Sequence, residues 1–322
     1  MNNLQDSHLP HVSIVMPAYN AARTLMEAVN SVLSQTYRDF ELIICNDAST
    51  DETENILNNI KDDRVRVIHN PRNLGEGPTR DRAIELARGI WLAVIDADDT
   101  WAPERLEVML REANASDDKM IFDDIIECHD TPSGMVPYHV LRGKHVFSCN
   151  GTEAIDVPTE TWICSPRLLI KPLLPLIYVK QNNVRHSCKY GADAAFFLQL
   201  LSCGLRLRYL PKAMYYYRIT QGSMTAWKNR YAMMQEVLEN TISYFEHAPN
   251  VQDAVRKKIS WAIRDGHNVE FFVALKSKEF SKALRIICQH PWIIPLFFRN
   301  LRKRMHYRVH RVWHGGCARG IR

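Results

Sequence analysis

Ile90-Trp91-Leu92-Ala93-Val94-Ile95-Asp96-Ala97-Asp98-Asp99 joins an apolar run to three carboxylates, so we expect a buried strand that ends in an aspartate-rich turn. Hard cations such as Mg²⁺ and Mn²⁺ take oxygen ligands. A site with one or two protein carboxylates usually completes its shell with substrate phosphates and water. Aspartate also favours turns that bind nothing. This segment alone therefore leaves both a metal site and a plain turn open.

The first third of the chain alternates strand-like and helix-like segments. Runs typical of strands occupy residues 12–16, 40–45, 64–69 and 90–95, and all of them except 64–69 are largely apolar. Helical spacing follows the first three runs, and we expect Asn20 to cap the first helix. Ser49 opens a capping box for the second helix, and Gly89 closes the third at residues 78–88. Strand and helix in alternation, with near-continuous apolar strands, predict an α/β fold whose parallel sheet is covered on both faces.

Polar residues follow each predicted strand. Ligands of such sheets bind beyond the carboxyl ends of the strands, where Asn20, Asp47 and residues 73–77 and 96–99 would collect. Each has a structural explanation of its own, such as a helix cap or a tight turn. Their occurrence on one edge favours a nucleotide site. The chain has neither a dinucleotide glycine fingerprint nor a Gly-Lys-Ser/Thr phosphate loop, which argues against an ordinary hydride-transfer or ATPase site.

Four ordered motifs resemble those of the family 2 inverting glycosyltransferases with the GT-A fold. They are Val12-Ser-Ile-Val-Met-Pro-Ala-Tyr-Asn20, Asn46-Asp-Ala-Ser-Thr-Asp51, Asn73-Leu-Gly75 with Arg80 downstream, and Asp96-Ala-Asp-Asp99. Later matches extend the resemblance to residue 225. It implies a GT-A catalytic domain over residues 1–225, with a nucleotide-binding, mostly parallel sheet flanked by helices. A helical region over residues 226–322, with a basic membrane-proximal tail, would follow.

The resemblance also implies that a UDP-sugar binds at this edge with Mn²⁺ or Mg²⁺. Asp98 would hold the metal, which bridges the diphosphate and acts as a Lewis acid on the departing UDP. Asp47 would contact the uracil or ribose, and Asp96 would lie by the ribose. Arg80 would line the donor pocket. The implied nucleotide-sugar site as a whole comprises Pro17, Tyr19, Asn20, Asp47, Arg80, Asp96, Ala97 and Arg218.

An inverting transfer needs one base, because the acceptor hydroxyl loses its proton as it attacks the anomeric carbon. The family places this base after a glycine, usually in an acidic pair at the start of a helix. Gly191-Ala192-Asp193 matches this setting and makes Asp193 the candidate. Ala192 replaces the usual glutamate, which leaves Asp193 with one neighbour fewer to raise its pKa. Asp193 also suits a helix cap, and the two roles are compatible.

Two further side chains have competing interpretations. Trp162 is a candidate acceptor contact, since an aromatic face suits a pyranose, but a tryptophan of the core explains the pattern equally well. Arg218 precedes Gln221-Gly222-Ser223-Met224, which resembles a loop that closes on the diphosphate. Arg218 is therefore either a phosphate contact or a surface charge.

The C-terminal segment carries the positive charge of the chain. Residues 280–322 contain ten Lys or Arg and no Asp or Glu, whereas the rest of the chain is net acidic. Apolar clusters within residues 291–298 precede the basic run 299–304. This pattern favours an anionic membrane surface over nucleic acid, with a solvated helix as the third possibility. The eight cysteines show no paired metal-ligand spacing and the start lacks a signal peptide's pattern, which suits the cytoplasm.

These features together predict a bacterial-type inverting glycosyltransferase. It would move a hexose from a UDP-sugar to a saccharide acceptor, lipid-linked in our interpretation, during exopolysaccharide or surface polysaccharide synthesis. It would act peripherally at the inner face of the cell membrane. A non-catalytic nucleotide-sugar-binding or scaffold protein at the membrane is the alternative, prompted by Ala192 and the basic tail. The sequence does not identify the sugar, the acceptor or the new linkage.

Overall fold

A computed structural model describes residues 9–113, 118–132, 134–166, 168–187, 191–219 and 230–295. The chain divides into two compact units. Unit 1 comprises the residues up to 225 together with residues 236–259, and unit 2 comprises residues 226–235 and those from 260 onward. Residues 236–259, which the sequence assigned to the C-terminal region, thus cluster with unit 1.

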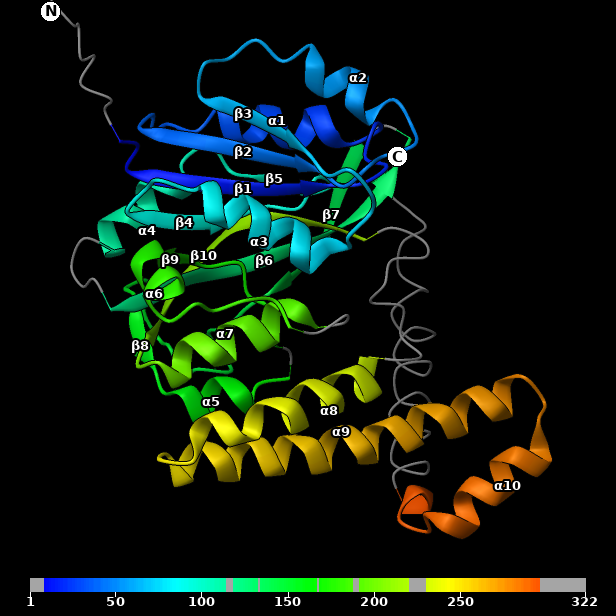
Figure 1. The fold of residues 1–322 in the computed structure, drawn as a ribbon. Helices are drawn as coiled ribbons and strands as arrows, with labels where there is room; N and C mark the ends of the chain where they lie inside the picture. The colour runs from blue at the N-terminus through cyan, green and yellow to red at the C-terminus, as the bar shows by residue number, and fades with distance from the viewer. Residues whose placement is uncertain are drawn as a thin grey trace, which may run out of the picture. The chain divides into compact units, whose positions relative to one another are not determined.

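The ten strands of the described residues form one sheet in unit 1 (Figure 1). Its main path is β3 (Val65–His69), β2 (Phe40–Asn46), β1 (Val12–Ala18), β4 (Trp91–Val94), β9 (Leu173–Pro175), β6 (Lys119–Thr131), β10 (Arg206–Ile219) and β5 (Thr100–Trp101). β7 (Gly134–Leu141) pairs with β6, and β8 (Ile155–Val157) with β10. The strands β1 to β4 are parallel, as predicted. The rest is mixed, because β5, β7, β8 and β9 run antiparallel to their partners.

Helices cover both faces of the parallel half. The described helices before residue 203 are α1 (Leu25–Leu33), α2 (Thr53–Asn58), α3 (Glu76–Leu86), α4 (Arg105–Ala113), α5 (Thr159–Ile163), α6 (Leu176–Gln181) and α7 (Ala192–Ser202). Alternate residues of β1, such as Ile14 and Met16, join the core that holds Leu25 of α1 and Leu106 of α4. α3 packs on β1 and β2, and Figure 1 shows it in front of these strands with α1 behind. Strands buried on both faces explain the near-continuous apolar runs of β1, β2 and β4.

The predicted helix caps were wrong. Asn20 has a positive φ of 48°, and its side chain accepts a hydrogen bond from the Thr50 amide at 2.8 Å instead of capping α1. Ser49 accepts from the Asn20 amide at 3.0 Å, and α2 begins only at Thr53. The loops after β1 and β2 lie together, so bonds between the loops replace local caps. Gly89 lies beyond the end of α3, and a Cβ there would come within 2.5 Å of the backbone nitrogen of Ser13.

The helices after residue 229 are α8 (Arg230–Thr241), the short 3₁₀ helix η1 (Ile242–Phe245), α9 (Pro249–Lys276) and α10 (Phe280–Gln289). Within unit 2, α9 and α10 share a small core formed by Phe271, Ala274, Ala283, Ile286 and Ile293. No helix among the described residues is long and apolar enough to span a membrane. The basic run 299–304 and the apolar residues 296–298, on which the membrane prediction partly depends, lie outside the described residues.

Candidate functional site

Asp47, directly after β2, organises the loop that leads into α3. Its carboxylate accepts hydrogen bonds from the amides of Leu74 at 2.8 Å and Gly75 at 2.9 Å, and from the Asn70 side chain at 2.7 Å. Gly75 has a φ of 88°, which a residue with a side chain rarely adopts. Asp47 is 3% exposed, and its contacts in the structure hold the backbone of this loop. A direct contact between Asp47 and the nucleoside stays a prediction.

The end of β1 presents an exposed aromatic ring at the same edge of the sheet. Tyr19 is 51% exposed and is followed by the exposed Asn20, whereas Pro17 is only partly buried within β1. β1, β2 and β4 are parallel, so the residues after each strand share this edge. An exposed tyrosine beside a polar loop suits one wall of a nucleoside site.

Beside this edge, unit 1 assembles a charged centre, which we define as Arg80, Lys171, Glu76, Asp96 and Asp193. Arg80 of α3 is 1% exposed, and its guanidinium donates to the carboxylates of Glu76, Asp96 and Asp193. The ammonium of Lys171 donates to Asp96 at 2.6 Å and to Asp193 at 3.1 Å. Two of the predicted donor residues, Arg80 and Asp96, therefore meet the predicted base Asp193, although 113 residues separate Arg80 from Asp193 along the chain.

Lys171 is the member of this centre that sequence reasoning missed. It lies just before β9 in an otherwise apolar segment and is 3% exposed. Its backbone carbonyl accepts a hydrogen bond from Arg105, whose guanidinium also binds Asp123 at 2.8 and 3.0 Å. A lone lysine in an apolar run is a usable signal, because a buried ammonium needs a carboxylate partner. The signal does not identify the partner.

Gly191 sets the position of Asp193. It has a φ of 63°, and a Cβ there would lie 2.8 Å from a methyl carbon of Val237. α7 begins directly after it, so Asp193 falls in the first turn of the helix. The positive end of the helix dipole favours a carboxylate there. The glycine before the predicted base Asp193 therefore has a conformational and a packing reason.

Asp193 is held in its ionised form. Burial raises its pKa, but Arg80 and Lys171 outweigh this and hold the pKa well below the ordinary value for aspartate. Arg80 contacts one carboxylate oxygen and Lys171 the other. Asp193 is thus a carboxylate anion at neutral pH, and a cation lies on each of its oxygens.

Asp99 is structural in this arrangement. Its carboxylate is fully buried and accepts hydrogen bonds from the Tyr215 hydroxyl at 2.7 Å and from the Arg218 amide at 2.8 Å. Burial raises its pKa well above the ordinary value, and Asp98 and Asp96 add to the effect. Asp99 therefore fixes the aspartate-rich turn to β10.

The surface-charge interpretation of Arg218 was wrong. Arg218 is 3% exposed, and its guanidinium donates to the Asp98 carbonyl at 2.7 Å, to Asp130 at 2.7 Å and to Glu27. These oxygens come from distant segments of the chain. Through these contacts Arg218 holds the aspartate-rich turn in place. To contact a phosphate, Arg218 would have to release one of these partners. The segment 221–224, predicted to close on the diphosphate, lies outside the described residues.

Of the three carboxylates in the aspartate-rich turn, the one that suits a metal ion is that of Asp98. Asp96 and Asp99 bind protein groups, whereas Asp98 forms no ion pair with any described residue. Burial and the neighbouring Asp96 raise the pKa of Asp98 to about 6, so a cation there would relieve an unfavourable charge. The described residues contain no cluster of three or more His, Cys, Asp or Glu that could hold a metal alone. One carboxylate at this position fits a cation that shares its shell with a diphosphate.

The acceptor prediction for Trp162 was wrong in this structure. Its side chain, in α5, is 0% exposed, and the neighbouring Ile163 is equally buried. A sugar ring could not reach its face. Packing decides whether an aromatic residue faces solvent, and the sequence around Trp162 does not reveal it. The alternative interpretation of Trp162 as a core residue therefore holds.

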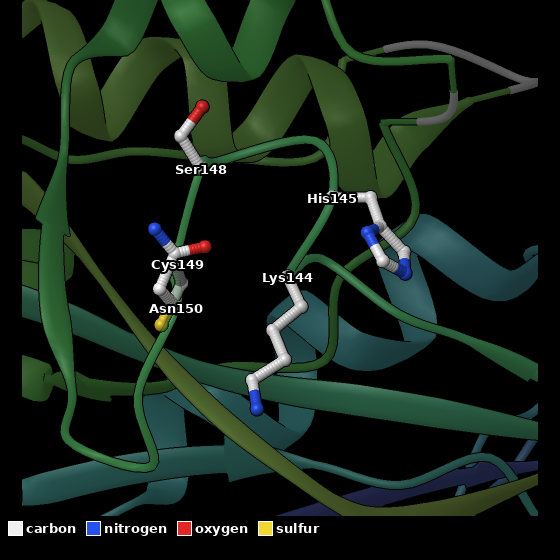
Figure 2. A pocket seen from close by; sticks show the side chains of 5 residues that line it. All are labelled: Lys144, His145, Ser148, Cys149 and Asn150. Atoms are coloured by element: carbon white, nitrogen blue, oxygen red, sulfur yellow. The ribbon is translucent and has the colours of Figure 1, made fainter.

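A separate open cavity of about 490 Å³ lies in the loop between β7 and β8 (Figure 2). Its lining residues are Lys144, His145, Ser148, Cys149 and Asn150. All of them come from this one loop, and none belongs to the charged centre. In Figure 2 the Lys144 and Ser148 side chains point in different directions, so the lining does not converge on one point.

We expect Arg105→Met to lower the free energy of unfolding by about 3–5 kcal/mol, because it leaves the buried Asp123 carboxylate without its cation. Both side chains are 0% exposed. Urea unfolding monitored by circular dichroism measures the change. The double variant Arg105→Met/Asp123→Leu is the control and should recover most of the loss. Equal stability of the single variant and the parent would contradict this account.

The family model "Glycosyl transferase family 2" matches residues 13–165. Among curated relatives, the succinoglycan biosynthesis protein ExoO of Rhizobium meliloti is 31% identical over 238 residues, which cover 70% of this chain and 65% of ExoO. The chain thus spans just under two thirds of that relative. The Escherichia coli protein WfaP, named UDP-Glc:alpha-D-GlcNAc-diphosphoundecaprenol beta-1,3-glucosyltransferase, is 30% identical, with 73% of this chain and 88% of WfaP covered.

Solved structures also resemble this chain. TarS 1–349 of S. aureus in complex with UDP-GlcNAc has a TM-score of 0.60 at 19% identity, covering 86% of this chain and 79% of that chain. The complex of the same fragment with UDP has a TM-score of 0.55 at 20% identity, covering 79% and 70%. At this identity the likeness shows a shared fold.

Proposed function

Because this chain belongs to glycosyl transferase family 2 and has the GT-A fold, we propose that it transfers a hexose from a UDP-sugar to a saccharide acceptor with inversion. The charged centre carries the proposal, since it brings Asp193 of α7 beside Arg80 and Asp96 of the donor edge. The similarity to WfaP, a UDP-Glc:alpha-D-GlcNAc-diphosphoundecaprenol beta-1,3-glucosyltransferase, supports a UDP-sugar donor and a diphosphate-lipid-linked acceptor. The similarity to the succinoglycan biosynthesis protein ExoO supports a role in exported polysaccharide synthesis.

Each residue of the site has a distinct part in the proposed reaction. Asp98 would hold Mn²⁺ or Mg²⁺, which when bound neutralises charge on the departing UDP. The nucleoside would lie against the exposed Tyr19, above the loop that Asp47 organises. Asp193 would take the proton from the acceptor hydroxyl as that oxygen attacks the anomeric carbon. Arg80 would place the donor next to this base.

The test is transfer by the purified full chain with Mn²⁺, a panel of UDP-sugars and a prenyl-diphosphate-linked saccharide. We expect one donor to be consumed, and NMR of the product should show the inverted anomeric configuration. Thermal shift with UDP and Mn²⁺ checks binding separately, because a ligand of the folded state raises its apparent stability. Binding without transfer or donor hydrolysis would favour the scaffold alternative that Ala192 prompted.

We propose that the C-terminal region attaches the protein to an anionic membrane surface, peripherally and on the cytoplasmic side. In α10, Phe280 and Leu284 are 65% and 63% exposed and lie one turn apart. Lys282 and Arg285 flank them, and no acidic residue occurs from Phe280 to the last residue of the sequence. Exposed apolar residues between cations suit the headgroup region of an anionic bilayer, where a lipid-linked acceptor would reside.

The double variant Phe280→Ser/Leu284→Ser should bind anionic vesicles at least about tenfold more weakly, since each side chain gains roughly 1.5–3 kcal/mol on burial. Co-sedimentation with phosphatidylserine-containing vesicles measures the binding. Removal of the residues after Pro291 should release the protein further at moderate salt, because each surface-bound Lys or Arg contributes on the order of 1 kcal/mol. Gln289→Ser, an exposed polar change on the same helix, is the control. Equal sedimentation of all variants would favour a solvated helix.

A further inference from the structure

We propose that Lys171 is a positioning residue that orients the Asp193 carboxylate for proton transfer and couples it to the donor edge through Asp96. This inference rests on the proposed function. Its basis is a single buried ammonium that lies 3.1 Å from an oxygen of Asp193 and 2.6 Å from an oxygen of Asp96. The two carboxylates belong to different parts of the chain, one after β4 and the other at the start of α7. Lys171 joins them directly.

The backbone of Lys171 is fixed independently of its side chain. Its carbonyl accepts a hydrogen bond from Arg105 of α4, and the buried Asp123 of β6 holds that arginine. The next residues form β9, which pairs with β4, the strand that ends just before Asp96. The ammonium of Lys171 therefore extends from a backbone segment that the sheet holds in place. A catalytic group held by rigid neighbours keeps its reactive geometry better than one held by a loop.

The two cations on Asp193 have different surroundings, and this separates their roles. Arg80 occupies one oxygen of Asp193 but shares its guanidinium with Glu76 and Asp96. A diphosphate entering the donor edge competes with these carboxylates for Arg80. Lys171 contacts the other oxygen and is anchored through its backbone, so it keeps the carboxylate oriented when Arg80 turns to the donor. The oxygen that Arg80 releases is then the one that accepts the proton.

Removing the Lys171 charge should raise the pKa of Asp193. The charged and titratable groups that face Asp193 are Arg80 from α3, Lys171 from the segment before β9, His186 from the segment before α7, and the carboxylates Glu76 and Asp96. Without Lys171 fewer cations oppose the two carboxylates. The base works only when ionised, so its activity is lost as pH falls through its pKa. In a Lys171 variant the acid limb of the pH–rate profile therefore moves to higher pH.

The test compares Lys171→Met with Lys171→Arg, which keeps the charge, and with the control Lys180→Met. Lys180 is an exposed lysine of α6, outside the charged centre, that donates to the Ala87 carbonyl at 2.6 Å. We expect kcat of Lys171→Met to fall about 10- to 100-fold, as for a misplaced catalytic group, with donor KM changed less than about threefold. Its acid limb should move up, Lys171→Arg should recover most of kcat, and Lys180→Met should match the parent.

A lysine that only stabilises the fold would lower the melting temperature without moving the acid limb. An unmoved acid limb, or an unchanged kcat in Lys171→Met, overturns the proposal. If Lys171→Met does not fold, Lys171→Gln removes the charge while keeping a hydrogen-bond donor. A second readout needs no activity: carbonyl NMR of ¹³C-labelled aspartate titrates Asp193 in the parent and the variant. A parent that transfers no sugar refutes the proposed function, whereas an unmoved Asp193 pKa refutes this inference alone.

Discussion

Asp193→Asn should bind UDP-sugar and metal as the parent does but transfer sugar about 10²- to 10⁴-fold more slowly, the range that general-base catalysis supplies. The change keeps the shape of the side chain and removes its ability to accept a proton. Donor affinity is measured by calorimetry and turnover by release of UDP, with kcat and KM determined separately. The acid limb of the pH–rate profile should disappear with the base.

Asp156→Asn is a matched control for this variant. Asp156 is also a carboxylate held by two cations, Lys119 and Arg208, each at 2.9 Å, but it lies in β8 outside the charged centre. It should retain nearly full activity. Gly191 is the N-cap residue of α7 and no side chain among the described residues caps this helix, so Asp193 is not its cap. If Asp193→Asn kept a rate close to that of the parent, Asp193 would be excluded as the base, and the search would move to other carboxylates such as Glu160.

Asp98→Ala should weaken Mn²⁺-dependent UDP binding by more than about 100-fold, because partners beyond the first ligand shell alone are worth about 10- to 100-fold in metal affinity. The fold should persist. Burial and Asp96 raise the pKa of Asp98 to about 6, so the folded state disfavours its charge and removal of the carboxylate costs no stability at neutral pH. Calorimetric titration of UDP with and without Mn²⁺ measures the loss, and thermal unfolding checks the fold.

The control for Asp98→Ala is Asp63→Ala, which removes an exposed aspartate between α2 and β3, away from the aspartate-rich turn. It should bind UDP and Mn²⁺ as the parent does. If Asp98→Ala keeps metal-dependent affinity for UDP, Asp98 is not a metal ligand. The cation would then have to use Asp96 or Asp99, and either would first have to leave its protein partners.

The parallel half of the fold could be predicted because the apolar sequence of each strand already indicates that the strand is buried on both faces. Residues 12–16 and 40–45 are apolar except for Ser13 and Glu41, and this near-continuous pattern is typical of a strand covered on both faces. The arrangement of the charged centre could not be predicted in this way. Asp96, Arg80 and Asp193 were each identified singly from motifs, but their meeting depends on how β4, α3 and α7 pack. Lys171 belongs to no motif, and nothing in its spacing gives its two partners.

The errors have one physical origin, since contacts between distant segments compete with local preferences. Asn20 has the chemistry of a helix cap, yet its side chain instead accepts a hydrogen bond from the Thr50 amide in the loop after β2. Arg218 has the chemistry of a surface charge, yet Glu27 and Asp130 bind it within the fold. Side-chain chemistry gives a set of possible partners, and only packing selects among them.

The contacts that Arg218 makes with Glu27, Asp98 and Asp130 have a use in protein engineering. Its partners Glu27, Asp98 and Asp130 all precede β7, and Arg218 itself lies in β10. Lys171 and Asp193 also fall after the loop that connects β7 with β8. The loop between β7 and β8, residues 142–154, contains none of these residues, so it can be treated as an interchangeable cassette. A hybrid with this loop from a relative would gain a new surface loop, while the host kept the strands β7 and β8, the Arg218 contacts and the proposed base.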